Sequence, residues 1–180
     1  MRGAISSQDL AYCGLFGAAS LLLPGLFHLV QLGRVFMPMY IPLIALAFLV
    51  RPLPASTTAL LTPLLSGALP GMPPFYPPVA ICMSLELSAM AALISSAIKF
   101  FPNAGALSIL LPVLFVGRIL YMGLTYAFSL LIDLPAEFMA GLSLVSGWPG
   151  LLLMALVVPS VVRTGKARAR KRTVEEESTR

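Results

Sequence analysis

The sequence predicts an all-α, polytopic membrane protein with six transmembrane helices, several of them broken by proline or glycine. Of its 180 residues, 58% are hydrophobic and only 11% are charged, whereas a soluble domain has about 25% charged residues. The apolar residues fall into six segments, and a membrane helix needs about 20 mostly apolar residues. The predicted helices cover residues 10–30, 38–50, 55–69, 79–98, 106–132 and 138–162, and a charged tail follows at 163–180.

The first predicted helix carries a small-residue pair and the only histidine. Gly14 and Ala18 lie four residues apart on one helix face, and small residues at this spacing let a second helix approach closely in lipid. The spacing fits either internal packing or a docking face for a partner. Pro24 and Gly25 disturb the helix shortly before His28. His28 is therefore either a structural hydrogen-bonding residue or a ligand contact beside a short connection.

The second and third predicted helices are short. Arg51 and Pro52 are expected to end the second helix, because a charge and a proline together interrupt its apolar run. Pro63 lies inside the third helix, where nearby threonine and serine hydroxyls either satisfy the backbone groups that the proline frees or face a ligand cavity.

A proline-dense loop at 70–78 follows the third helix. Five of its nine residues are proline, which has no N–H and a fixed φ, so the loop cannot form a helix or a central strand. We expect a stiff loop at the mouth of a binding site, with Met72 and Tyr76 as candidate contacts.

The fourth and fifth predicted helices each hold one ionisable residue well inside an apolar segment. Glu86 lies about two turns from the start of the fourth helix, and Arg118 lies near the middle of the fifth. Charges within a bilayer are costly and usually face the protein interior or a wet cavity. Two interpretations stay open: a structural ion pair, or ligand contacts in which Arg118 binds a carboxylate, phosphate or amide oxygen. Tyr40 and Tyr121 can supply rings and hydroxyls to such a site.

The charged tail at 163–180 sets the expected topology. It is basic, then acidic, and too polar to enter the membrane. The positive-inside rule places it in the cytoplasm, and six spans then place the N-terminus there too. Arg51 and Lys99 fall in cytoplasmic loops and the loop at 70–78 falls outside, with Arg34 as the exception among the loop charges.

The composition argues against several classes of function. The net charge of +5 comes mostly from the tail, so it does not indicate nucleic-acid binding. One histidine and no close cysteine pair argue against a metal site, and Cys13 and Cys82 are expected to be small buried apolar residues. The sequence has neither a convincing Ser/His/Asp arrangement nor a phosphate-binding glycine loop. We expect no enzymatic activity, no ATP hydrolysis by this chain and no cofactor.

Four short segments carry a resemblance to a known family. They are 38–42 (PMYIP), 62–66 (TPLLS), 70–74 (PGMPP), followed by Glu86, and 117–121 (GRILY). In this order they resemble the substrate-binding S components of energy-coupling factor (ECF) vitamin transporters, over roughly residues 14–126. Tyr40 and Pro70 stand where the family pattern has histidine and threonine.

The resemblance implies a six-helix protein of the prokaryotic plasma (inner) membrane that captures a vitamin or related small molecule at the outer face. The candidate substrate-binding residues are His28, Tyr40, Met72, Tyr76, Glu86, Arg118 and Tyr121. Gly14 and Ala18 match the small-residue pattern by which the first helix of S components contacts a transmembrane coupling subunit. Two ABC ATPase subunits are the further partners that the resemblance implies, and they would supply ATP hydrolysis.

Two other functions fit the same composition. A stand-alone secondary carrier would transport without an ATPase and is often built from internal repeats, of which the sequence has no convincing example. A non-transporting membrane scaffold or assembly factor would need no ligand, and Glu86 and Arg118 would then serve stability alone.

Overall fold

The computed structural model describes residues 6–29, 38–69, 73–76, 78–131 and 150–164. Within these ranges all regular secondary structure is helical, which confirms the all-α prediction. The helices are α1 (Ser7–Leu29), α3 (Tyr40–Ala47), α4 (Pro52–Ala68), α5 (Val79–Phe100), α6 (Ala106–Leu131) and a C-terminal helix, Gly150–Thr164.

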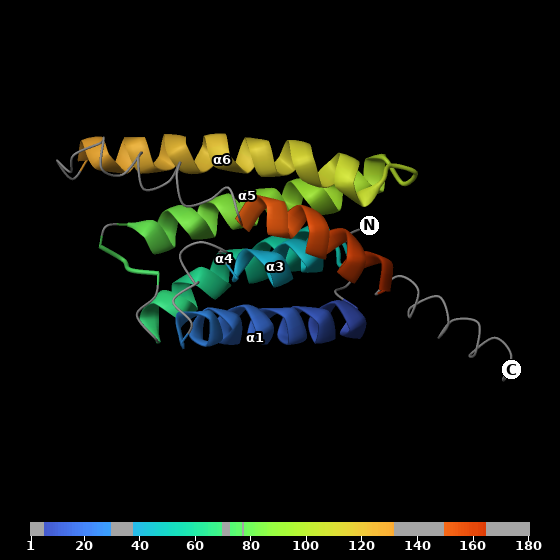
Figure 1. Ribbon diagram of the computed structural model, residues 1–180, viewed down its shortest axis with the longest axis horizontal. Helices are drawn as coiled ribbons and strands as arrows, with labels where there is room; N and C mark the ends of the chain where they lie inside the picture. Colours follow the sequence, from blue (N-terminus) through green and yellow to red (C-terminus); the bar gives the residue numbers. More distant parts are fainter. Residues whose placement is uncertain (1–5, 30–37, 70–72, 77, 132–149, 165–180) are drawn as a thin grey trace, which may run out of the picture.

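The long helices lie side by side along the longest axis of the molecule (Figure 1). α5 packs against both α4 and α6, and the chain runs through α5 in the direction opposite to its course in those two helices (Figure 1). α1 packs against α3 and α4. The loop end of the molecule is the end where α4 and α6 finish and α5 begins (Figure 1).

Three described helices are long and apolar enough to cross a membrane: α1 over Ser7–Phe27, α5 and α6. Large apolar side chains on their outer faces are exposed, with Leu15 at 66% and Phe115 at 70%. Soluble monomers rarely expose contiguous apolar surface on this scale, whereas lipid covers it at no cost. The length of these helices and their apolar outer surface indicate a membrane protein.

The prediction of six spanning helices is met only in part. α3 has 8 residues, about 12 Å at 1.5 Å per residue, so it cannot cross a bilayer alone. α4 has 17 residues, fewer than the roughly 20 that a membrane helix needs, and contains Pro63. Length and composition thus support three of the six predicted spans among the described residues.

The boundary between the second and third predicted helices differs from expectation. Pro52 does not end a helix; it opens α4, and Arg51 is the N-cap residue. Proline is favoured in the first turn of a helix, because its φ is already helical and the missing N–H has no partner there. The second helix, predicted at 38–50, is the shorter α3, since the chain turns after Ala47.

The C-terminal helix also extends beyond its predicted limit. It continues to Thr164, so the first two residues predicted for the charged tail are helical. The predicted segment 138–149 and the rest of the tail, 165–180, lie outside the described residues.

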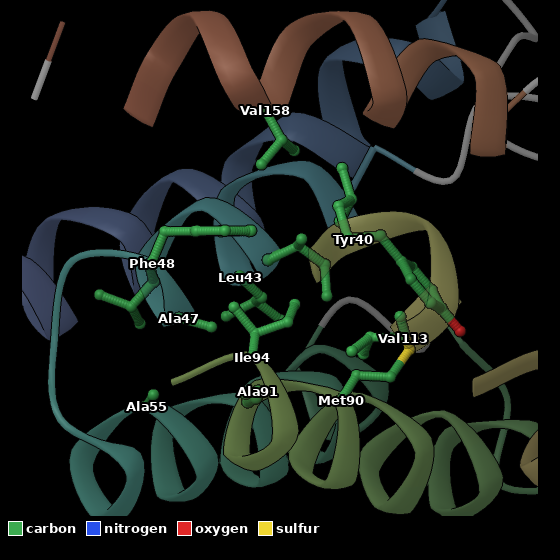
Figure 2. Packing of buried hydrophobic residues seen from close by; sticks show 14 of the residues in the cluster. Tyr40, Leu43, Ala47, Phe48, Ala55, Met90, Ala91, Ile94, Val113 and Val158 are labelled. Carbon is green, nitrogen blue, oxygen red and sulfur yellow. The ribbon is translucent and has the colours of Figure 1, made fainter. Parts of the chain in front are cut away.

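The hydrophobic core forms around α3. Seven of its eight residues are buried, and a helix that is apolar on all sides is expected to be enclosed by others. Met90 and Ile94 of α5, Val113 of α6 and Val158 of the C-terminal helix belong to the same core cluster (Figure 2). This packing fixes the position of α3, and therefore of Tyr40 at its first turn.

Polar contacts hold the helices together at the end opposite the loop end. Arg51 Nε lies 3.0 Å from Asp9 Oδ2 of α1, and Ser95 Oγ of α5 donates a 2.6 Å hydrogen bond to the Val50 carbonyl. The Arg51 side chain is 48% exposed, so its ion pair contributes at most about 1 kcal/mol. The buried Ser95 bond matters more, because it satisfies a carbonyl where α3 has ended.

The proline-dense loop packs directly against the last turn of α4. A Cβ atom on Gly67 would lie 2.8 Å from the Pro73 carbonyl oxygen and 3.0 Å from the Phe75 ring. Backbone at this distance cannot yield as a flexible side chain can. Gly67 is therefore required for the loop to rest on α4, and it fixes residues 73–76 over the loop end.

Gly67→Ala is expected to displace the loop and to destabilise the protein by about 1–3 kcal/mol, the usual cost of overpacking. The matched control is Gly123→Ala in α6, where nothing lies within 4 Å of the added Cβ. Alanine there should be neutral or stabilise by up to about 1 kcal/mol, because it is the better helix former. Thermal unfolding of the two variants in detergent measures the difference. Equal melting temperatures would show that the loop does not rest on Gly67.

Candidate functional site

A buried carboxyl group lies between helices near the loop end. Glu86 is in the second turn of α5 and is 1% exposed. The Tyr40 hydroxyl, at the start of α3, donates a hydrogen bond to Glu86 Oε2. Figure 2 shows this hydroxyl directed away from Leu43 and Phe48 of the apolar core. Burying a polar group is costly unless it is hydrogen-bonded, so Tyr40 stabilises the carboxyl at this position.

Arg118 of α6 brings a positive charge to the same place. Its guanidinium interacts electrostatically with the Glu86 carboxyl and with the hydroxyls of Tyr40 and Tyr121, and its Nη1 atom is buried. Tyr121 lies on the same face of α6, one turn nearer the loop end. These four residues, Tyr40, Glu86, Arg118 and Tyr121, form the polar cluster. It joins α3, α5 and α6, and all four of its members were predicted as site residues.

A glycine makes the approach of α6 to α5 possible. A Cβ atom on Gly117 would lie 2.8 Å from Met90 Cγ and 3.2 Å from Met90 Cε, and Met90 is only 1% exposed. Gly117 directly precedes Arg118, and Met90 follows Glu86 by one helical turn. The close contact therefore sets the distance between the two charged residues.

Facing pairs of residues follow one another along α5 and α6 towards the loop end. They are Met90–Gly117, Glu86–Arg118 and Cys82–Thr125. Successive members on α5 are four residues apart, which is about one turn, and the two helices run in opposite directions (Figure 1). The face between α5 and α6 thus changes from apolar packing to charge and then to hydroxyl and thiol groups.

The pair nearest the loop end was not assigned a function from the sequence. Cys82 was expected only to be buried, and it is 1% exposed. Thr125 is 3% exposed and was given no role. Its spacing offered a signal, because it follows Arg118 by seven residues and Tyr121 by four, which places all three on one helix face.

The other predicted site residues are placed differently. Tyr76 is 70% exposed, so it does not belong to the buried polar cluster. His28 lies near the end of α1, but its side chain and all of Met72 lie outside the described residues. Gly14 and Ala18 are exposed on α1, and nothing lies within 4 Å of a Cβ added at Gly14. In the described part of the chain, these two residues therefore do not serve internal packing.

The chemistry of the polar cluster suits binding. It offers a carboxyl acceptor, a guanidinium donor and two phenol groups whose rings and hydroxyls contact different parts of a molecule. Among the described residues, no group of three or more histidine, cysteine, aspartate or glutamate side chains is placed to hold a metal ion. A carboxyl and a guanidinium group side by side can exchange hydrogen bonds with a polar compound.

No known protein family, curated protein or solved structure matches this chain. Its function is therefore inferred from its own residues and their geometry.

Proposed function

We propose that this chain is the substrate-binding S component of an ECF-type importer, which binds a vitamin or related small molecule for ATP-driven uptake. One observation carries the proposal. Tyr40, Glu86, Arg118 and Tyr121 come from three of the segments that resemble S components, and they interact in one cluster in which Tyr40 and Glu86 are buried and the other two half-buried. Residues that lie up to 81 positions apart in the sequence (40 and 121) thus share a site.

The position of this cluster favours entry from the outer face. Glu86 lies seven residues after the start of α5, about 10 Å from the loop end at 1.5 Å per residue. The proline-dense loop rests on α4 at that end through Gly67. The basic C-terminal tail belongs to the opposite face by the positive-inside rule, which makes the loop end the outer one.

The same proposal includes a six-helix topology with both termini in the cytoplasm of a prokaryotic cell. α3, with 8 residues, is too short to span alone, so in this proposal it is one part of a larger membrane domain. Ser95 and the Arg51–Asp9 pair then lie towards the cytoplasmic side. Arginine is common in the cytoplasmic loops of membrane proteins.

The partners in this proposal are a transmembrane coupling subunit and two ABC ATPase subunits. The exposed face of α1 with Gly14 and Ala18 supports the first of these, because small residues allow close helix contact in lipid. ATP hydrolysis belongs to the partner ATPases.

Arg118→Ala tests the proposal. We expect wild-type protein, purified in detergent from cells grown in vitamin-rich medium, to carry a vitamin-like compound in about equimolar amount, detected by mass spectrometry. Arg118→Ala should lose it, because a fixed donor of the polar cluster is removed. Arg163→Ala, on the exposed end of the C-terminal helix, removes the same charge and should keep the compound.

The outcomes separate the three candidate functions. Uptake of the bound compound only together with a coupling subunit and ATPases supports an S component, and uptake by the chain alone identifies a secondary carrier. If wild-type protein carries no compound and Arg118→Ala only lowers the melting temperature, the chain is a scaffold and the proposal is wrong.

A further inference from the structure

A buried hydroxyl on α6, next to the polar cluster, lacks a hydrogen bond of ordinary geometry within the described part of the chain. Thr125 is 3% exposed, and among the described residues its Oγ1 has no hydrogen-bond partner of ordinary geometry. Cys82 and Tyr121 are its polar neighbours, close enough for weak, poorly aligned hydrogen bonds with it. Burying a hydroxyl without a partner costs about 1–3 kcal/mol in proteins, so this position is expected to have a compensating use.

Several other hydroxyls in the described helices avoid this cost by bonding within their own helix. Ser84 Oγ donates a 2.7 Å hydrogen bond to the Ala80 carbonyl. Thr62 Oγ1 likewise donates a 2.7 Å hydrogen bond to the Thr58 carbonyl. The same arrangement occurs at Ser20, Ser56, Thr57, Ser129 and Ser160. This local bond is the usual solution for serine and threonine in helices. Thr125 Oγ1 does not make this bond.

The polar cluster also limits the charge of a molecule that binds beside it. When Glu86 is ionised, the cluster holds one negative charge, on Glu86, and one positive charge, on Arg118. A ligand with a net charge would leave one buried charge without compensation, which is strongly unfavourable. A ligand that is uncharged, or that carries one charge of each sign, preserves the balance.

We propose that Thr125 is a ligand-contacting residue, whose hydroxyl hydrogen-bonds an uncharged or zwitterionic small molecule held between α5 and α6 beside Cys82 and Tyr121. This inference rests on the proposed function and adds to it a residue and a ligand class. The ligand reaches from the level of Thr125 to that of Arg118, about two helical turns along α6.

The test compares Thr125→Val with Thr125→Ser. Valine keeps the shape of threonine and removes the hydroxyl, whereas serine keeps the hydroxyl. The probes are three uncharged compounds, nicotinamide, pyridoxine and riboflavin, and three anions, nicotinate, pantothenate and biotin. Affinities are measured by the rise in melting temperature with probe concentration in detergent.

An uncharged probe should stabilise wild type and Thr125→Ser, and bind Thr125→Val about tenfold more weakly, the effect of one lost hydrogen bond. Without probe, Thr125→Val should melt at the same or a higher temperature, because an unsatisfied hydroxyl has been removed. If the Thr125 hydroxyl served only the stability of the fold, Thr125→Val would melt at a lower temperature than wild type.

Three results would overturn the inference. Equal affinity of an uncharged probe for wild type and Thr125→Val excludes Thr125 as a contact. Stabilisation of wild type by anions alone excludes the ligand class, while the S-component proposal stands. If no probe stabilises wild type, this inference fails, whereas the proposed function is decided by the co-purified compound.

Discussion

Gly117→Val is expected to separate α6 from α5, to lower the melting temperature by several degrees and to abolish retention of a co-purified compound. The added side chain would occupy the space of Met90, which is 1% exposed and cannot move into solvent. Overpacking of this kind costs about 1–3 kcal/mol. Because Arg118 follows directly, the shift would also carry its guanidinium away from Glu86, so binding and stability should fall together.

Removing the opposing side chain should reverse part of the effect. Met90→Ala deletes the Cγ, Sδ and Cε atoms that a Cβ at Gly117 would meet. Alone, this substitution should cost about 2–5 kcal/mol, because it leaves a cavity. The double variant Gly117→Val/Met90→Ala should be more stable than the sum of the two losses predicts, since residues in contact are not additive.

Gly123→Val is the matched control on the same helix. Nothing lies within 4 Å of a Cβ at Gly123, so the only expected change is the small difference in helix propensity between glycine and valine. Melting temperature and mass spectrometry of the co-purified compound are measured for all four variants. If Gly117→Val behaves like Gly123→Val, close helix contact does not position Arg118.

The sequence was sufficient to predict where most helices lie and that Glu86 is buried. Long apolar runs predict helices in any membrane protein, and an isolated Glu86 or Arg118 within such a run must face inward. These inferences depend on local composition alone. They could not show that Tyr40 pairs with Glu86, because that contact depends on how α3 packs in the core.

Composition could not predict the structure at residues such as proline and glycine, which can play either of two roles in a helix. Pro52 can end one helix or begin the next, and only the position of Arg51 as N-cap decides between them. Glycine in a helix is either a weak point or a site of close approach. Gly117 and Gly123 look alike in the sequence, yet only Gly117 faces another helix.

Thr125 shows the same limit for the candidate site. Threonine in a membrane helix usually bonds to its own backbone, so the spacing of Thr125 from Arg118 and Tyr121 was a weak signal. Its value as a candidate comes from burial without a hydrogen bond, which is a property of the packed structure.

Tyr40→Phe is expected to destabilise the protein by about 1.5–3 kcal/mol, the range for a lost hydrogen bond to a charged group. The ring would still fill its place in the core, but Glu86, 1% exposed, would lose the donor that accompanies its burial. Tyr126→Phe is the control, because Tyr126 is 59% exposed on α6 and its hydroxyl is open to the surroundings. Thermal unfolding in detergent measures both variants.

A double-mutant cycle with Glu86→Gln separates the hydrogen bond from the shape of the ring. Glutamine can still accept a bond from Tyr40 but carries no charge, so Tyr40→Phe in that background should cost only about 0.5–1.5 kcal/mol. Tyr40→His should retain part of the stability, since an imidazole N–H can also donate. If Tyr40→Phe costs the same with Glu86 as with glutamine, the carboxyl is not held by this bond. If Tyr40→Phe loses stability but keeps the co-purified compound, the Tyr40–Glu86 pair serves the fold alone. Binding would then depend on Arg118 and Tyr121.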